Sequence, residues 1–520
     1  MRAAAAAGGG PLAYACVLGA GLVVASERIV FVDWGDFARV TPFMLWKPVE
    51  GANGMLWHFL PNGWEPLRRF DAGALAFGAF GRLQQWTGGL FYDLRWHSLA
   101  AKLALLVCAW LMVRQLALHT GFGRIGRIGQ GVAFTALGVA LFQAHNIGML
   151  KTFYAEYVFF VGLPLLLLGL LKDEASERRS RLALITVGTL LCTIAKVQYL
   201  YLPLLVLGCL WWCGRRPRGS GAAPPLGTAT VAALLAVQLV GLLPLADNRY
   251  AQLNHHQSTY FGSYLLMKPE HLRALGLGER EIGCVGIDSW GHRAEGPGGT
   301  LPREVGGSCF GERPLGLGDV LRPYLAHPSL LGRLSAYALP HHFTTDYFHV
   351  YRQQRYLAAV DAGGWQAAWP LVWASRAREA VLTPLWWLVV VLGAAVGLLG
   401  RWQRRRGSGA TALGSEMDHR RRGDTGAAER IDGDAAHVPG PGLHTATLLL
   451  ALFIPTQIAI SLLGEGIRDL SKHLWAAQLA LDLLALALLA HASAAMAGSR
   501  LFDRSVGRAG HMLGRRRNAP

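Results

Sequence analysis

The sequence is poor in charged residues, in acidic residues above all, and in cysteine. Only 16% of its 520 residues are charged and 52% are hydrophobic, whereas soluble proteins carry about 25% charged residues. So much apolar surface must be buried that intrinsic disorder is excluded as the main state. Cysteine, with 7 residues, is too rare for a small disulfide scaffold. The mean hydropathy of +0.29 predicts a polytopic membrane protein.

Acidic residues are outnumbered, because 33 Asp and Glu stand against 50 Lys and Arg and leave a net charge of +17. In a soluble chain this excess would suggest a nucleic-acid partner. In a membrane protein the basic residues gather in cytoplasmic loops. We therefore expect the lipid bilayer, and no nucleic acid, among the partners of this chain.

About ten apolar segments approach the roughly 20 residues that a helix needs to cross a bilayer. The first is expected to be a retained anchor, because one basic residue, Arg2, precedes it and no small-x-small cleavage site follows. The stretch 182–213 is too long for one helix and short for two, which predicts a broken or re-entrant pair. The segments lie near 11–26, 98–118, 130–146, 154–171, 182–196, 199–213, 228–246, 381–400, 445–463 and 473–495.

Arginines are concentrated in every second connection between these segments, in the region 401–422 and in the C-terminal tail. By the positive-inside rule both termini are cytoplasmic and the number of spans is even. The predicted units are an N-terminal transmembrane module (1–246) with an acidic external loop (27–97), an extracytoplasmic domain (247–378), a transmembrane helix (379–400), a disordered cytoplasmic linker (401–443), a transmembrane hairpin (444–495) and a basic tail (496–520). Cys284 and Cys309 both fall in the external domain, where either a disulfide or two buried thiols are expected.

Ionisable residues at the outer ends of the spans are the candidates for function, because a charge in the bilayer costs about 2.5–3.5 kcal/mol and usually faces a cavity. Asp33, Asp36 and Arg39 follow the first span. A carboxylate there is suited to be a general base or a metal ligand. The alternative is a solvated turn in which an aspartate caps a short helix.

Three further groups lie on the same predicted side of the membrane. Glu156 opens an apolar run, and the alternative to a functional role is an interfacial pair with Lys151. Lys196 interrupts an apolar run and either snorkels to the interface or binds a phosphate. The last external turn is the densest, and its cations suit a phosphate or a diphosphate unless they only pair with its own acids; it contains Glu465, Arg468, Asp469, Lys472 and His473. Asp482, inside the final span, needs a partner from elsewhere.

Several short motifs resemble the GT-C class of integral-membrane glycosyltransferases, and within it the hexose transferases of bacterial glycan biosynthesis. The motifs are WGDFAR at 34–39, FYAE at 153–156, YFG at 260–262, PEHLRALGL at 269–277 and GEGIRDLSKH at 464–473. Two positions depart from the pattern, since Glu465 replaces an aspartate and Tyr157 replaces a proline. The resemblance implies an all-α polytopic membrane protein with a small extracytoplasmic domain, in a bacterial inner membrane.

The resemblance also implies transfer of a sugar from a polyprenyl-phosphate donor to a glycan or lipid-linked acceptor of the cell envelope. On this reading Asp36, or else Asp33, deprotonates the acceptor hydroxyl and the anomeric centre is inverted. Cations stabilise the departing phosphate, and Glu156 binds sugar hydroxyls or helps a divalent metal such as Mg or Mn, whose involvement stays open. The expected phosphate-binding cations are Arg468 and Lys472, with Arg39 and Lys196.

Two other functions fit the same outer charges. The first is a transporter, polymerase or ligase of a lipid-linked glycan, which would use the cations without needing Asp36. The second is a non-catalytic subunit of a cell-envelope assembly. Sugar transfer by the wild type and its loss in Asp36→Asn would separate the glycosyltransferase from both.

Overall fold

The structure is a computed structural model of the whole chain. It describes residues 2–27, 29, 44–46, 58–61, 72–89, 92–120, 126–172, 177–214, 227–243, 251–295, 301–304, 309–311, 313–345, 362–421 and 440–516.

Helices make up most of the described chain. They are α1 (Arg2–Ser26), α3 (Ala72–Trp86), α4 (Leu94–Thr120), α5 (Gly126–Leu141), α6 (Ala144–Met149), α7 (Glu156–Leu171), α8 (Arg178–Ala195), α9 (Leu202–Gly214), α10 (Thr228–Leu242), α11 (Ala251–Tyr260), α12 (Pro269–Ala274), α13 (Glu279–Gly283), α14 (Leu317–Ala326), α15 (Leu330–His342), α18 (Ala362–Arg421), α19 (Pro441–Glu465), α20 (Leu470–His473) and α21 (Trp475–Arg516). Two small antiparallel sheets join β1 (Met44–Trp46), β2 (His58–Pro61) and β3 (Tyr92–Asp93), and β4 (His292–Glu295) with β5 (Leu301–Glu304).

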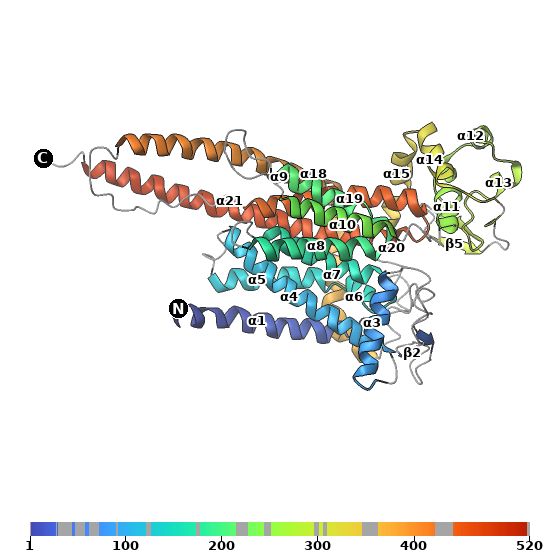
Figure 1. The fold of residues 1–520 in the computed structure, drawn as a ribbon, viewed down its shortest axis with the longest axis horizontal. Coiled ribbons are helices and arrows are strands. Elements are labelled where there is room, and N and C mark those ends of the chain that lie inside the picture. Colours follow the sequence, from blue (N-terminus) through green and yellow to red (C-terminus); the bar gives the residue numbers. More distant parts are fainter. Residues whose placement is uncertain are drawn as a thin grey trace.

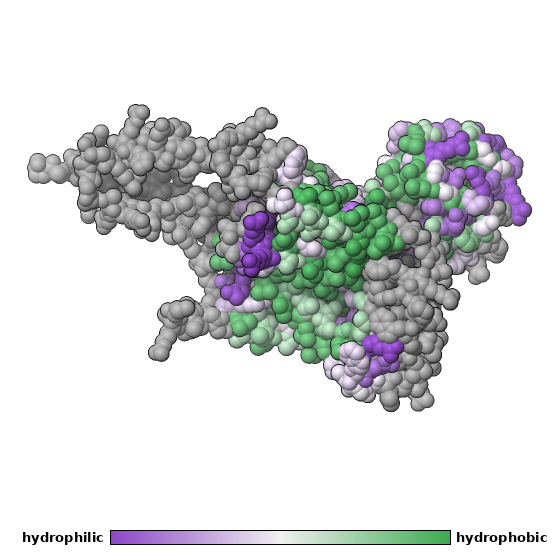
Figure 2. All heavy atoms as spheres, viewed as in Figure 1, coloured by the Kyte–Doolittle hydropathy of each residue, from purple (hydrophilic) through white to green (hydrophobic). Residues whose placement is uncertain are grey.

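Among the described residues, 5 helical segments are long and apolar enough to cross a membrane. A band of hydrophobic side chains surrounds the middle of the helical bundle, and hydrophilic side chains cover α12 to α14 (Figure 2). The fold is therefore that of an all-α membrane protein, and the expected total of about ten spans stays a prediction. The long segments are Leu94–Leu118, Val197–Gly214, Pro370–Gly400, Pro441–Glu465 and Trp475–Met496, and shorter apolar helices cover Gly10–Ser26, Ile128–Leu141, Glu156–Leu171 and Thr228–Leu242.

The two ends of the bundle differ. Helix α1 begins and α21 ends at one end, which we call the terminal end (Figure 1). Helices α11 to α15 lie beyond the other, which we call the domain end. This arrangement agrees with the expectation that both termini share one side of the membrane, and which side that is stays a prediction.

Glycines let the helices of the bundle approach closely. A Cβ at Gly188 of α8 would lie 2.4 Å from the backbone nitrogen of Leu166 in α7, and one at Gly162 would lie 2.9 Å from that of Cys192. Small residues at such contacts are how helices pack where no hydrophobic driving force acts between them in lipid. This contact fixes α7, and with it Glu156 at its first turn, against α8 and Lys196 at its end.

The break predicted within 182–213 is present. Helix α8 ends at Ala195, Lys196 is extended with φ of −161°, and a 3₁₀ turn over Val197–Tyr199 leads into α9. In an unbroken apolar helix a lysine reaches for the interface. Here the extended backbone at Lys196 and the 3₁₀ turn after it accompany a side chain that lies within the bundle, 8% exposed.

The predicted linker over 401–443 is wrong for its first half. Helix α18 continues to Arg421, and α21 likewise continues through the predicted tail to Arg516. The composition suggested disorder, but a helix that packing already holds needs no new nucleus to grow, and Ala and Arg propagate it readily. The N-terminal boundary differs as well, since α18 begins at Ala362, inside the predicted external domain.

The small domain at the domain end is built from α11 to α15 and the β4–β5 hairpin. A disulfide joins Cys284 to Cys309, which confirms the first of the two alternatives expected for this pair. Its core contains Tyr260, Tyr264, Leu272, Leu277, Cys284 and Leu315.

Candidate functional site

Charged and polar side chains from separate segments converge at the domain end of the bundle. Glu156 belongs to the start of α7, Lys196 and Gln198 to the break after α8, Glu465 to the end of α19, and His473 to the end of α20. We call these five residues the polar cluster. Burial of such groups is unfavourable unless each finds a partner, so their contacts decide what the cluster can do.

Glu156 and Lys196 form a buried ion pair. Lys196 Nζ lies 2.9 Å from Glu156 Oε1, and the two side chains are 8% and 1% exposed. The alternative in which Glu156 pairs with Lys151 is therefore wrong, because Lys151 binds a different carboxylate. The break at Lys196 and the first turn of α7 meet here across 40 residues of chain.

His473 extends the pair into a chain of hydrogen bonds. Lys196 Nζ also lies 2.9 Å from His473 Nδ1, and His473 Nε2 contacts Glu465 Oε2. An ammonium group can only donate, so Nδ1 accepts and Nε2 carries the proton that is donated to Glu465. Burial lowers the pKa of His473 and Lys196 lowers it further, against the opposing effect of Glu465. His473 is therefore a neutral bridge between Lys196 and Glu465.

Gln198 completes the coordination of Glu465. Its Nε2 donates to Glu465 Oε1 at 2.7 Å, while His473 holds the second oxygen of the same carboxylate. Gln457 Nε2 in turn donates to the backbone oxygen of His473 at 3.3 Å. Both ends of the cluster are thus carboxylates held in place by named donors.

The turn between α19 and α21 is fixed by the small domain. Gly466 adopts φ of +64°, and a Cβ there would lie 2.5 Å from the backbone oxygen of Gln257 in α11. The backbone nitrogen of Ile467 donates to the oxygen of Phe261 at 3.1 Å, and Ser258 Oγ donates to the oxygen of Leu463 at 2.5 Å. Helix α11 therefore lies directly on the turn that carries Glu465 and His473.

Two cations of this turn have contacts outside the polar cluster. Arg468 Nε lies 3.2 Å from Asp288 Oδ2 and 3.6 Å from Asp469 Oδ1. Lys472 Nζ lies 4.8 Å from the centre of the Tyr154 ring, a cation–π geometry. Arg468 is compensated by two carboxylates, and the phosphate-binding role expected for both cations stays a prediction.

A second charged group holds the end of α1. Glu27 accepts from Lys102 Nζ at 2.5 Å and lies 3.3 Å from Lys151 Nζ, which also donates to the backbone oxygens of Ser26 and Glu27. Burial lowers the pKa of Lys151 to about 7. For Glu27, burial raises the pKa, but Lys151 and Lys102 outweigh it and leave it lowered. This group fixes the point from which the acidic loop departs.

The residues predicted to be catalytic, Asp33 and Asp36, lie outside the described residues, as does Arg39. Their roles stay predictions. The loop that carries them leaves α1 at Glu27, and Glu27 is bound to Lys151, five residues before Glu156. An extended chain covers up to about 3.5 Å per residue, so the loop starts from the same region as the polar cluster.

Sequence reasoning missed Glu27, Lys102, Gln198 and Asp288 as parts of these groups. Lys102 carried a usable signal, because a lone lysine inside an apolar span is a functional candidate by default. Gln198 stood next to Lys196 in the sequence but is uncharged. Asp288 lies in the small domain, and only the three-dimensional structure relates it to Arg468.

No group of three or more His, Cys, Asp or Glu side chains with metal-binding geometry occurs within the described residues. In the polar cluster the Lys196 ammonium contacts both Glu156 and His473, which bridges to Glu465, a position that competes with a divalent cation. The possibility of Mg or Mn binding therefore stays a prediction centred on Asp33 and Asp36.

The partner that Asp482 needs is Arg378 of α18. Arg378 Nε donates to Asp482 Oδ1 at 2.5 Å, and the side chains are 5% and 2% exposed. Arg378 Nη2 also donates to the backbone oxygen of Gln478 at 3.1 Å. This pair ties α18 to α21 and lies apart from the polar cluster in the contacts that it makes.

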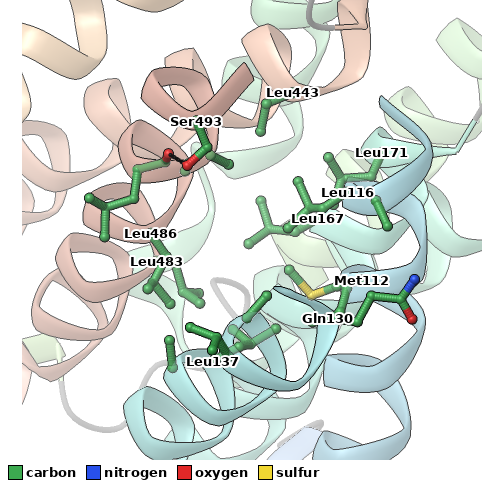
Figure 3. Close-up of a pocket in the computed structure, with 18 of the residues that line it drawn as sticks. Met112, Leu116, Gln130, Leu137, Leu167, Leu171, Leu443, Leu483, Leu486 and Ser493 are labelled. Atoms are coloured by element: carbon green, nitrogen blue, oxygen red, sulfur yellow. Dashed lines mark hydrogen bonds between the residues drawn. The ribbon is translucent and has the colours of Figure 1, made fainter. Parts of the chain in front are cut away.

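The terminal half of the bundle contains an apolar cavity of about 450 Å³. Helices α4, α5, α7, α19 and α21 enclose it, and Figure 3 shows leucines from these helices pointing into it, with Gln130 and Ser493 at its margin. Ser493 donates its hydroxyl proton to the backbone oxygen of Leu489, one turn earlier. This cavity has no group that could act on a substrate.

Comparison with known proteins gives a distant relative and no family. The chain is 21% identical over 402 residues to a protein of Escherichia coli (strain K12) described as uncharacterized protein YfdI, and the match covers 76% of this chain and 77% of that protein. No model of a protein family matches the chain. No solved structure matches it significantly.

Proposed function

We propose that the chain is an integral-membrane glycosyltransferase of the GT-C type. It would transfer a sugar, a hexose by resemblance, from a polyprenyl-phosphate donor to a cell-envelope glycan on the extracytoplasmic face, with inversion. The observation that carries the proposal is the convergence of Glu156, Lys196, Glu465 and His473, from four segments, beneath the small domain.

Three properties of the polar cluster support this choice. It lies at one end of apolar helices, where a lipid-borne donor in the bilayer can reach it. It contains a buried cation, Lys196, that is held by Glu156 and His473 in a fixed position. Preorganised charges of this kind stabilise charge that develops in a transition state and need little rearrangement to do so.

The reaction then assigns a role to each region. A carboxylate of the first loop, Asp36 or else Asp33, takes the proton of the acceptor hydroxyl. The acceptor oxygen forms a bond to the anomeric carbon while the bond from that carbon to the phosphate oxygen breaks. The phosphate leaves with the electron pair and is stabilised by Lys472 and Lys196. Glu156 and Glu465 are the carboxylates that would accept hydrogen bonds from sugar hydroxyls.

A transfer assay tests the proposal. The purified protein in nanodiscs is given a radiolabelled polyprenyl-phosphate hexose and an envelope glycan extract. We expect Asp36→Asn to lower the transfer rate by at least about a hundredfold, since it removes the general base. Asp33→Asn tests the second aspartate, and Glu279→Gln is the matched control because its side chain, in the small domain, is 74% exposed.

The outcomes separate the candidate functions. Transfer that survives in Asp33→Asn, in Asp36→Asn and in the double variant would sink the mechanism. The absence of transfer from every polyprenyl-phosphate sugar by the wild type would instead favour a transporter, polymerase or ligase of a lipid-linked glycan. Loss of activity in Glu279→Gln as well would mean that the assay reports folding and not catalysis.

A further inference from the structure

An exposed tryptophan stands on the small domain beside the turn that carries the polar cluster. Trp290 is 52% exposed, although a ring of this size normally gains from burial. Single exposed hydrophobic residues are common and need no explanation by themselves. What distinguishes Trp290 is how firmly its backbone and its ring are held.

The turn from Asp288 to His292 is closed by its own hydrogen bonds. Asp288 is 0% exposed, and its Oδ1 accepts from the backbone nitrogens of Trp290 at 2.9 Å and His292 at 2.8 Å. The Asp288 nitrogen donates to the His292 oxygen at 2.8 Å. Gly291 supplies the positive φ, +83°, that the turn requires. A buried carboxylate thus holds an exposed indole in one place.

Arg468 holds the ring itself. Its guanidinium carbon lies 5.5 Å from the centre of the Trp290 ring, and its Nε lies 3.2 Å from Asp288 Oδ2. Arg468 belongs to the turn after α19, three residues from Glu465, so it connects the small domain to the polar cluster. The ring is therefore preorganised with respect to the proposed site of transfer, which lowers the entropic cost of binding.

The local charge decides which ligand suits this surface. Arg468 faces two carboxylates, Asp288 and Asp469, at 3.2 Å and 3.6 Å. One cation between two anions does not attract a phosphate. A neutral polyol is compatible with it, because its C–H face packs on an aromatic ring and its hydroxyls both donate to carboxylates and accept from a guanidinium. His292, whose side chain is 31% exposed, adds a further polar group at the edge.

We propose that Trp290 and Arg468 form a stacking subsite for a neutral sugar ring of the acceptor glycan. The ring packs on the indole, and its hydroxyls reach Arg468 and His292. The assignment to the acceptor rests on the proposed function, whereas the binding of a neutral sugar does not. Trp290 is a positioning residue, since it would hold the acceptor at a distance from the reacting atoms.

Sugar binding is measured first, in the absence of any donor. The full chain is placed in nanodiscs, because maltoside detergents carry sugar head groups, and is titrated with the methyl glycosides of glucose, galactose and mannose. Saturation-transfer NMR reports the bound sugar. We expect at least one glycoside to bind about three- to tenfold more weakly to Trp290→Ala and almost normally to Trp290→Phe. The control is Trp86→Ala, since Trp86 at the end of α3 is 84% exposed.

Equal binding of all three glycosides to wild type and Trp290→Ala would overturn the subsite, as would an equal loss in Trp86→Ala. The transfer assay then tests the assignment to the acceptor. We expect Trp290→Ala to raise KM for the acceptor and to leave kcat and the donor KM unchanged, whereas a merely structural role would lower kcat. Glycoside binding that depends on Trp290 in a protein without transferase activity would retain the subsite and reject the proposed function.

Discussion

The polar cluster and the apolar cavity are built on the same helices and have opposite chemistry. Helix α7 contributes Glu156 to the cluster at its first turn and Leu167 to the cavity near its end. Helix α19 contributes Leu450 to the cavity and Glu465 to the cluster at its last residue. At a rise of about 1.5 Å per residue, the two sites on α7 are about 17 Å apart.

The difference shows what the fold invests at each end. At the domain end each ionisable group has a partner from another segment, and these contacts span long distances in the sequence. At the terminal end the helices leave a space lined by leucine and alanine that no polar contact closes (Figure 3). Specific pairing is concentrated where chemistry is proposed, and loose apolar packing is tolerated elsewhere.

The largest effect should come from breaking the pair at the domain end. Lys196→Met leaves Glu156 buried without its ammonium partner, which we expect to lower the free energy of unfolding by about 3–5 kcal/mol. The double variant Lys196→Met with Glu156→Leu should recover most of this loss, because a hydrophobic pair replaces the ionic one. SDS titration of the protein, followed by circular dichroism, measures both.

The control for this comparison is an exposed ion pair. Arg273 and Glu279 of the small domain lie 2.7 Å apart with side chains 53% and 74% exposed, so Arg273→Met should cost about 1 kcal/mol or less. A Lys196→Met protein as stable as the wild type would show that Glu156 does not depend on Lys196. The double variant should fold and yet fail to transfer sugar, which would separate stability from catalysis.

Neighbouring leucines of α7 test the packing side of the comparison. Leu166 is 0% exposed and packs against Gly188 of α8, whereas Leu167 lines the cavity. Leu166→Ala should cost about 2–4 kcal/mol in the same titration, because it creates a new void. Leu167→Ala only enlarges an existing one and should cost about 2 kcal/mol or less. Equal costs would mean that the cavity is filled in the folded protein.

Much of the fold was accessible from the sequence, because apolar runs of membrane length can form little besides helices. The break near Lys196 followed from the length of 182–213, and the Cys284–Cys309 disulfide from its expected oxidising side. The helical extension of α18 over 401–421 did not follow. Its composition is that of a linker, and only the helix that precedes it makes the continuation favourable.

The candidate site was accessible in part. Charges at the ends of apolar runs identified Glu156, Lys196, Glu465 and His473, because ionisable groups there are costly. Their pairing was not accessible, and Lys151 is the example. It is five residues from Glu156 in sequence and yet binds Glu27, more than a hundred residues away. Sequence neighbours suggest local pairs, whereas the packing of α1 against the bundle decides the real one.

The domain end should also be sensitive to pH through Lys151, the smallest of the expected effects. Its pKa of about 7 in the folded protein lies below the ordinary value of 10.5 because of burial. Below pH 7 the folded state carries the full cost of the buried charge. As the pH rises from 7 toward 10.5 the folded lysine loses its proton while the unfolded one keeps it, so stability should rise, by at most about 1.4 kcal/mol per pH unit.

Unfolding titrations at pH 7, 8 and 9 measure this slope, and Lys151→Met is the matched variant that should remove it. Glu27 adds nothing in this window, because its lowered pKa leaves it ionised in both states. A neutral Lys151 amine still has protons for the backbone oxygens of Ser26 and Glu27, so the end of α1 should remain anchored. A slope that persists in Lys151→Met would assign the pH sensitivity to another group, and the charged domain end would then owe it to something other than this lysine.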